Sequence, residues 1–222
     1  MRLNLTFRIR GMMYQLHFQS ISIPWVKTIG MSARIPYSSH FVPFLDYDNI
    51  WDQVLAEHEL PFLQELFGLG DFAVLKTGEH AKHAVCCDRL MLREVLEILD
   101  NSSCDYAFKR GIRYNEYRTW ILRVVQKGNR PKPKYLFTVE SPYNGQHLQS
   151  QAHAMFLQNY YGAKIRLVNP DGFTKLKIQR PDGTIEVVDA QSFEIQEYKT
   201  GSKVDREAPK HWPIIRRLKT MP

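Results

Sequence analysis

The sequence predicts an α+β fold with mixed or antiparallel sheets and flanking helices. Short apolar or alternating segments typical of strands recur along the chain, and turn signals such as Pro181-Asp182-Gly183 separate neighbouring ones. Segments with helical spacing lie between them without the regular strand–helix alternation of a doubly wound parallel sheet. These observations favour antiparallel pairing, with helices packed against the sheets.

Length and composition fit one globular domain. The chain has 222 residues, of which 44% are hydrophobic and 24% are charged, values that are ordinary for a folded protein. A domain of this size buries roughly 70% of its unfolded surface, so it needs neither disulfides nor a structural metal to fold. We therefore expect one α+β domain over residues 1–200. Residues 201–222 are expected to form a loosely held, basic C-terminal tail.

The N-terminal half predicts a hairpin followed by buried strands and two helices. Residues 3–9 and 13–19 alternate polar and apolar side chains, which indicates a β-hairpin. Further strands are expected over residues 41–45, 72–75 and 82–87. A first helix is expected to begin at Ile50 and to break or restart at Pro61. A second helix is expected over residues 90–99, where leucine and valine recur on one face.

The C-terminal half predicts mainly strands with one helix. Strands are expected over residues 103–108 and 117–125, and a basic loop follows at 126–134. The helix is expected over residues 146–161. Residues 164–198 return to a β pattern, to which the sequence assigns no function.

The charge of the chain indicates a polyanionic partner. The formal net charge is +7 and the isoelectric point is about 9.3. Such a balance suits phosphate contacts with release of counterions, as in binding to nucleic acids or nucleotides. The plain alternative is that the charge serves solubility alone.

The cysteines and the hydropathy pattern predict a cytoplasmic protein. An odd number of cysteines without paired spacing argues against a disulfide framework, and the absence of Cys-x-x-Cys argues against a zinc ribbon. A reducing cytosol is therefore the expected compartment. Residues 1–25 lack the apolar core of a signal peptide, and no apolar stretch approaches the length of a membrane span.

Asp46 and Asp48 are the first candidate site residues. They directly follow a short apolar run and, as alternate residues of a strand, they point to the same face. Two carboxylates this close repel each other unless a cation lies between them, and Mg²⁺ prefers such oxygen ligands. The structural alternative is an acidic turn that caps the following helix.

Lys82 and His83 are the second pair of candidates. They begin the strand that follows the turn at residues 77–80, and alanine on either side of the pair leaves room for a ligand. A protonated imidazole can hold a phosphate oxygen. The alternatives are a surface histidine in a turn or a zinc site with His80, although no third soft ligand follows at zinc-like spacing.

Asp105 and a group of cations complete the candidates. A third carboxylate at Asp105 would suit a two-metal phosphoryl-transfer site, although the residue alone also suits a turn or a strand edge. Arg123 is favoured for triphosphate contact because it lies nearer than Arg118 to the basic loop. Four loop residues can track a nucleic-acid backbone, or can simply be solvated: Lys127, Arg130, Lys132 and Lys134.

In this order the motifs resemble the catalytic core of the archaeo-eukaryotic primase superfamily, which includes primase-polymerases of plasmids and phages. The family's first motif, apolar residues followed by Asp-x-Asp, matches residues 44–48. Its second motif, a small residue, any residue and His, matches residues 81–83, with alanine where serine is frequent. Its third motif, an apolar residue followed by Asp, matches Cys104-Asp105. The resemblance covers about residues 40–130.

The resemblance implies a template-dependent nucleotidyltransferase of the DNA primase or polymerase type. It implies two Mg²⁺ or Mn²⁺ ions bound by Asp46, Asp48 and Asp105. It implies nucleotide phosphates held by His83, Lys82 and Arg123. The implied partners are a DNA template and nucleoside triphosphates, with a helicase or other replication proteins beside them.

Two other functions fit the same residues. One is a non-catalytic nucleic-acid-binding protein that assists replication, in which the basic loop and nearby aromatic side chains contact the strand. The other is a metal-dependent nuclease that uses the same three acids.

Overall fold

The chain divides into two compact units in the computed structural model. One unit comprises residues 1–26 together with 199–222, and the other comprises residues 27–198. The structure describes residues 2–9, 12–19, 29–113, 120–126, 130–180 and 184–192. The sequence had placed residues 1–200 in one domain, whereas the contacts separate the N-terminal segment from the rest. The predicted tail, residues 201–222, lies outside the described residues.

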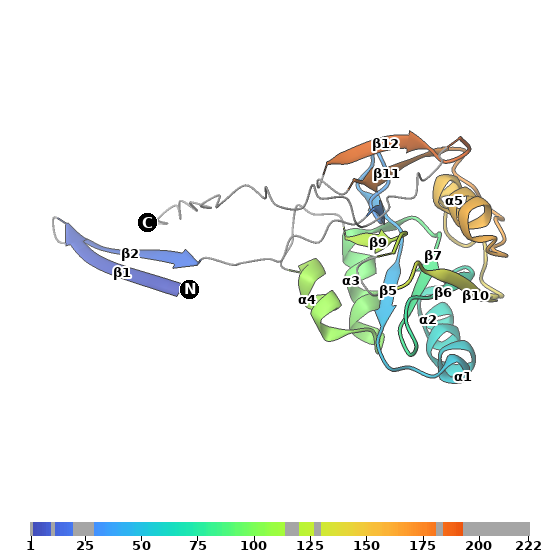
Figure 1. Cartoon of the computed structure of the whole chain (residues 1–222), viewed down its shortest axis with the longest axis horizontal. Helices are drawn as coiled ribbons and strands as arrows, with labels where there is room; N and C mark the ends of the chain where they lie inside the picture. The colour runs from blue at the N-terminus through green and yellow to red at the C-terminus, as the bar shows by residue number, and fades with distance from the viewer. Residues whose placement is uncertain are drawn as a thin grey trace. The chain divides into compact units, whose positions relative to one another are not determined.

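The N-terminal unit contains the predicted hairpin. Strands β1 (Arg2–Ile9) and β2 (Met12–Gln19) pair antiparallel, with Leu5 opposite Leu16. The two strands form the hairpin that the sequence predicted (Figure 1), and apolar positions lie opposite apolar ones, and polar opposite polar, in most of its pairs.

The first sheet of the larger unit has the strand order β10-β6-β7-β5. All three pairings between neighbours are antiparallel. The strands are β5 (Phe44–Tyr47), β6 (Phe72–Lys76), β7 (Lys82–Cys86) and β10 (Lys134–Val139). The first three confirm the strands predicted at residues 41–45, 72–75 and 82–87, because each segment is short, apolar and bounded by a turn.

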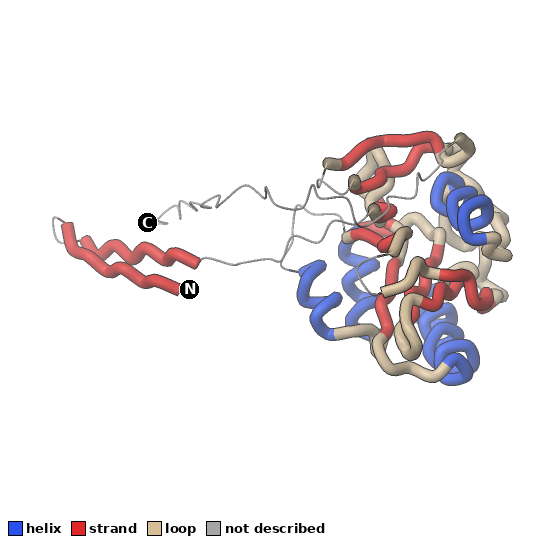
Figure 2. The backbone as a smooth tube through the Cα atoms, in the orientation of Figure 1, coloured by secondary structure: helices blue, strands red, loops and turns tan. Residues whose placement is uncertain are grey.

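The second sheet has the order β12-β11-β3-β9, and its pairings are also antiparallel. Its strands are β3 (Gly30–Ser32), β9 (Ile121–Arg123), β11 (Lys175–Gln179) and β12 (Ile185–Asp189). A further small pair joins β4 (His40–Phe41) to β8 (Leu90–Met91). The α+β class with antiparallel sheets is thus confirmed, as the strands and helices in Figure 2 show.

The helices lie on both sides of the first sheet. They are α1 (Asp52–Val54), the π-helix η1 (Leu55–Glu59), α2 (Leu60–Phe67), α3 (Leu92–Asn101), α4 (Tyr106–Arg113) and α5 (Gln151–Tyr161). The Tyr47 hydroxyl donates to Glu59 of η1, whereas the Phe44 ring lies against His153 of α5 on the other face. None of the helices in the described segments is long and apolar enough to cross a bilayer.

Local backbone signals explain where the first helices begin and end. Asn49 does not cap the first helix, because it adopts a left-handed conformation (φ 61°) and α1 starts after Trp51. Pro61 does not break the helix, because it occupies the first turn of α2, where its missing N–H costs nothing. Gly68 ends α2 in a left-handed conformation (φ 62°), as expected for a glycine C-cap.

Three predicted elements in the second half differ from the structure. Residues 103–108 were expected to form a strand, but α4 begins at Tyr106 because the Asp105 carboxylate accepts a hydrogen bond from the Phe108 N–H. The strand expected over 117–125 is limited to β9 within the described residues. The helix expected over 146–161 begins only at Gln151, because residues 142–147 form turns.

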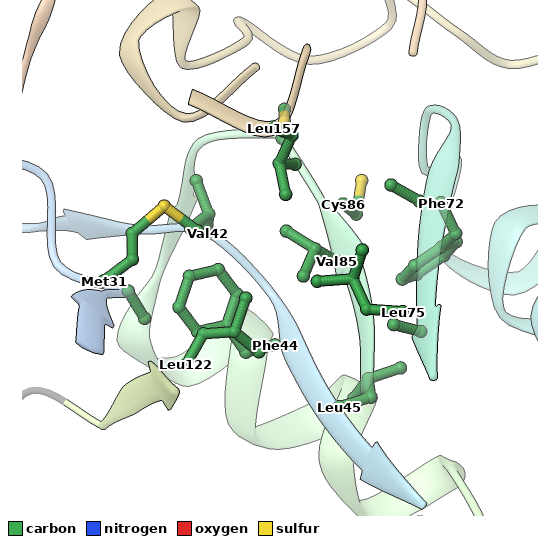
Figure 3. Packing of buried hydrophobic residues seen from close by; sticks show 14 of the residues in the cluster. Met31, Val42, Phe44, Leu45, Phe72, Leu75, Val85, Cys86, Leu122 and Leu157 are labelled. Atoms are coloured by element: carbon green, nitrogen blue, oxygen red, sulfur yellow. The ribbon is translucent and has the colours of Figure 1, made fainter. Parts of the chain in front are cut away.

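The hydrophobic core joins both sheets and α5. Phe44 and Val85 of the first sheet lie near Met31 and Leu122 of the second, with Leu157 of α5 above them (Figure 3). All three cysteines are buried and free. Burial raises the pKa of the thiols of Cys86, Cys87 and Cys104.

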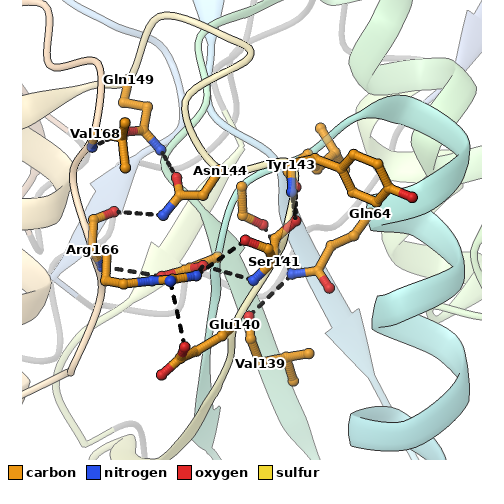
Figure 4. Close-up of polar contacts among 12 residues, drawn as sticks. Gln64, Val139, Glu140, Ser141, Tyr143, Asn144, Gln149, Arg166 and Val168 are labelled. Carbon is orange, nitrogen blue, oxygen red and sulfur yellow. Dashed lines mark hydrogen bonds and ion pairs between the residues drawn. The ribbon is translucent and has the colours of Figure 1, made fainter.

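A buried polar network ties the C-terminal segment to the first sheet. The Arg166 guanidinium donates to both carboxylate oxygens of the buried Asp71, at 2.9 and 2.7 Å, and to the Ser141 carbonyl (Figure 4). The Ser141 N–H also donates to Asp71. Nearby, Gln149 accepts from the Val168 N–H and donates to Asn144. These contacts satisfy the buried groups and fix the loop before α5.

His153 connects α5 to β3 in the interior. One ring nitrogen, Nε2, lies 2.9 Å from the Ser32 carbonyl, and Nδ1 lies 2.7 Å from the Ser150 hydroxyl. Because a carbonyl only accepts, Nε2 carries the proton and Nδ1 accepts from Ser150. Burial lowers the pKa of His153 to about 4, against smaller opposing effects of the Ser32 carbonyl and Asp171.

This depressed pKa predicts a loss of stability in mild acid. Below pH 6.5 the histidine of the unfolded chain binds a proton that the folded chain binds only near pH 4. The free energy of unfolding should therefore fall by about 3 kcal/mol as the pH falls through this window. Urea unfolding at several pH values measures it. In His153→Gln the free energy of unfolding should depend less steeply on pH, by an amount that corresponds to about one proton. Equal pH dependence in the two proteins would contradict the assignment of this effect to His153.

Candidate functional site

A pocket of about 450 Å³ is lined by residues from both sheets of the larger unit. Its walls come from the end of β5, the β6–β7 turn, β7, α4, β9 and the segment at residues 130–131. Five predicted site residues line it: Asp46, Asp48, His83, Arg123 and Arg130. Its volume lies within the usual range for small-molecule sites.

Asp46 and His83 meet because β5 and β7 pair in register. Asp46 lies directly opposite His83, so both side chains point to the same face of the sheet. His83 Nε2 is 3.3 Å from Asp46 Oδ1. The other ring nitrogen, Nδ1, is buried without a partner in the described part of the chain. An unpaired buried nitrogen costs free energy, so the site favours a bound group that can pair with it.

Asp48 lies just beyond β5 in a turn that the β6–β7 hairpin holds. The Asn49 N–H donates to the His80 carbonyl at 3.0 Å, and the left-handed conformation of Asn49 reverses the chain there. The Asp48 side chain is exposed and lines the pocket. Asp46 and Asp48 therefore both line the pocket, although only Asp46 lies in the strand, where the sequence had predicted both.

Arg123 brings a fixed positive charge to the pocket wall. Its guanidinium donates to the carbonyls of Val125 and Pro131, at 2.8 and 2.6 Å, and to the Thr77 carbonyl at 3.3 Å. These bonds use three of its five N–H groups. Burial lowers the pKa of Arg123, and nearby Arg130 lowers it further, whereas Tyr161 and Asp46 oppose the shift. Two guanidinium groups this close favour an anion between them.

Lys82 is not brought to the pocket. As the neighbour of His83 in β7, it points to the opposite face of the sheet. Its ammonium lies 2.6 Å from the Asp52 carboxylate and donates to the Ile50 carbonyl at 2.5 Å, and its side chain is only 4% exposed. The expected phosphate contact is thus replaced by a structural role, in which Lys82 anchors the segment that follows Asp48.

Asp105 lies beside Asp46 but does not line the pocket. Its N–H donates to the Asp46 carbonyl at 2.7 Å, which brings the third motif next to the first. Its Oδ1 accepts from the Phe108 N–H at 2.8 Å, so the side chain caps α4. In the described segments no group of three or more His, Cys, Asp or Glu side chains could hold one metal ion. The three predicted ligands therefore do not form such a cluster.

The predicted cations of the basic loop lie in different surroundings. Arg130 lines the pocket, whereas the Lys132 ammonium lies over the Tyr160 ring, 4.1 Å from its centre. Lys134 is exposed at the start of β10, opposite Lys76 of β6. Lys127 lies outside the described residues.

Three further residues of the pocket wall were not predicted from the sequence. Phe108 of α4, Ile121 of β9 and Glu79 of the β6–β7 turn also line the pocket. Phe108 was assigned to a strand rather than a helix. Ile121 could have been predicted from the alternation of side chains in a strand, because it lies two residues before Arg123 and therefore points to the same face.

The donor set fits one divalent cation bound together with a phosphate. Mg²⁺ is commonly held by one or two carboxylates, with water and substrate phosphates as its remaining ligands. Asp46 and Asp48 provide such a pair within one pocket, and Arg123 and Arg130 add positive charge there. The residues present therefore suit a metal–phosphate ligand rather than a closed protein cage.

Comparison of the chain with protein-family models, curated proteins and solved structures finds no match.

The position of Lys82 predicts a loss of stability when its charge is removed. Lys82→Met leaves the Ile50 carbonyl and the Asp52 carboxylate without their donor, which should lower the free energy of unfolding by about 2 kcal/mol. The matched control is Lys76→Met, at the exposed position directly opposite in β6, which should change it by less than about 0.5 kcal/mol. Urea unfolding measures both, and equal stability of the two variants would exclude the anchoring role.

Proposed function

We propose that the chain is a template-dependent nucleotidyltransferase of the primase-polymerase type. The observation that carries this proposal is one pocket that combines two carboxylates, an imidazole and two guanidinium groups. Negative and positive side chains in one cavity suit a nucleoside triphosphate with its divalent ion, because each charge of that ligand meets its opposite. The order of the motifs along the chain, which resembles that of the primase superfamily, supports the same function.

Asp46 and Asp48 are the residues that would hold Mg²⁺ or Mn²⁺. When bound, such an ion neutralises charge that develops on the transferred phosphoryl group. Asp105 contributes through its backbone, since its hydrogen bond to the Asp46 carbonyl fixes the end of β5. In this proposal two carboxylates, rather than three, face the substrate.

His83, Arg123 and Arg130 would bind the triphosphate. His83 Nε2 lies 3.3 Å from the Asp46 carboxylate, so the imidazole and the proposed metal ligand face the same part of the pocket. The buried Nδ1, which has no partner in the described part of the chain, would pair with a polar group of the bound nucleotide. Arg123 needs no rearrangement to contribute its charge, because three carbonyls already hold its guanidinium. Such preorganised charges contribute most of the rate enhancement in phosphoryl transfer.

The proposed partners are a DNA template and nucleoside triphosphates, in a cytoplasmic setting. A helicase or other replication proteins are further proposed partners, in line with the resemblance. The formal charge of +7 is in keeping with a nucleic-acid partner.

Primer extension with Mn²⁺ tests this function. Asp46→Asn and Asp48→Asn remove one carboxylate charge each at nearly constant shape, and each should lower nucleotide incorporation by about 100-fold or more. Asp105→Asn should retain activity within about tenfold, because asparagine also caps helices. Asp100→Asn, an exposed residue of α3 outside the pocket, is the control for charge removal.

The other outcomes separate the alternatives. Equal loss in Asp105→Asn and Asp46→Asn would restore Asp105 as a metal ligand. Cleavage of the primer without extension would identify a nuclease. Binding of DNA with no reaction in any variant would leave a non-catalytic replication accessory protein and overturn the proposal.

A further inference from the structure

The second sheet has one buried and one partly exposed face. Met31, Leu122 and Ile178 lie side by side across β3, β9 and β11 and are buried in the core. The residues beside them in each strand point the other way. On that outer face Lys177 lies opposite Val187, and Gln179 lies opposite Ile185. Val187 and Ile185 are 36% and 51% exposed, which is unusual for neighbouring apolar side chains in a sheet.

Arg34 adds a second cation to this outer face. The β3–β11 register places Lys177 beside Ser32, so Arg34, two residues further on, is its diagonal neighbour. The pKa of Lys177 is lowered by partial burial and, to a lesser degree, by Arg34. No ion pair joins either side chain to a carboxylate within the described ranges. Two adjacent like charges that no acid neutralises favour a bound anion.

Two residues of β9 connect the second sheet to the pocket. Arg123 of β9 lies opposite Gly30 of β3, and Ile121 lies opposite Ser32. Gly30 has no side chain, and the space beside its Cα is filled by Ile121, whose Cγ2 would lie 1.8 Å from an added Cβ. Ile121 and Arg123 both line the pocket. Ser32, which lies between Lys177 and Ile121, is fully buried, so the partly exposed part of the outer face lies on β11 and β12.

An exposed aromatic ring lies at one end of this face. Tyr37, in the turn between β3 and β4, is 82% exposed, and the edge of its ring contacts Phe173, just before β11. Tyr37 adopts a left-handed backbone conformation (φ 56°), which costs free energy for a residue other than glycine. An exposed ring beside cations is the arrangement on which unpaired bases stack.

We propose that the partly exposed part of this outer face, on β11 and β12 together with Arg34, binds single-stranded DNA. The inference rests on the proposed function, for which the strand is the template. Arg34 and Lys177 contact its phosphates, and Tyr37 stacks on a base. Val187 and Ile185 cover sugar and base surfaces that a duplex would keep stacked inside, which favours a single strand over a duplex.

Fluorescence anisotropy with a labelled oligo-dT strand, measured in EDTA at several salt concentrations, tests the proposal. Without a divalent ion or nucleotide the readout does not depend on catalysis. Arg34→Ala/Lys177→Ala should weaken binding about tenfold and reduce the slope of log K against log salt by about 1.4, the value for two lost contacts to a single strand. Tyr37→Ala should weaken binding by about tenfold while the slope stays unchanged, because stacking releases no counterions.

A charge-matched control is Arg93→Ala/Lys164→Ala, which removes two exposed cations from outside the second sheet. It should bind as the wild type does, and thermal unfolding should give similar midpoints for all variants. The proposal would be overturned if Arg34→Ala/Lys177→Ala kept the wild-type slope of log K against log salt. It would also be overturned if the control weakened binding equally, or if the protein bound only duplex DNA or RNA. If the variants bind DNA more weakly but the wild type incorporates no nucleotide, this surface remains a DNA-binding site and the proposed function is excluded.

Discussion

The antiparallel register between β5 and β7 is the constraint on which the candidate site depends. It places Asp46 opposite His83 and Tyr47 opposite Lys82. In a strand the side chains alternate between faces, so a slip of one residue would turn Asp46 toward the helices and Tyr47 toward the pocket. The segment after β5 is tied to the β6–β7 turn beside these pairs, because the Asn49 N–H donates to the His80 carbonyl. The pairing of Asp46 with His83 in the pocket thus follows from the way β5 and β7 align.

The parts of the site that the sequence predicted are those set by local patterns. Asp46 comes directly after an apolar run, and His83 comes shortly after a turn that contains glycine. Both residues could therefore be assigned to the ends of strands. Lys82 could have been excluded by the alternation of side chains, because adjacent strand residues cannot share a face. Asp105 was predicted to lie in a strand because its segment shows no clear hydrophobic periodicity. The helix that forms there depends on one capping hydrogen bond, from the Phe108 N–H to the Asp105 carboxylate.

Other features could not be derived from the sequence because distant segments determine them. The guanidinium of Arg123 is held by carbonyls from three places, of which Thr77 lies far from it in the chain. Likewise, the pairing of β3 with β9 and β11 joins the beginning, middle and end of the larger unit. Such long-range pairings have no local signature, and they place Arg34 beside Lys177. The class of the fold was therefore predictable, whereas the sheet order and the combined surface were not.

The inaccessible thiols have a practical consequence for spectroscopy. A thiol reacts with alkylating reagents as its thiolate, and burial keeps Cys86, Cys87 and Cys104 both protonated and shielded. A new cysteine placed on an exposed loop would then be the preferred attachment point for a spin label or a dye. Interatomic distances could be followed in the otherwise unaltered chain, without first replacing the native cysteines and disturbing the core that they fill.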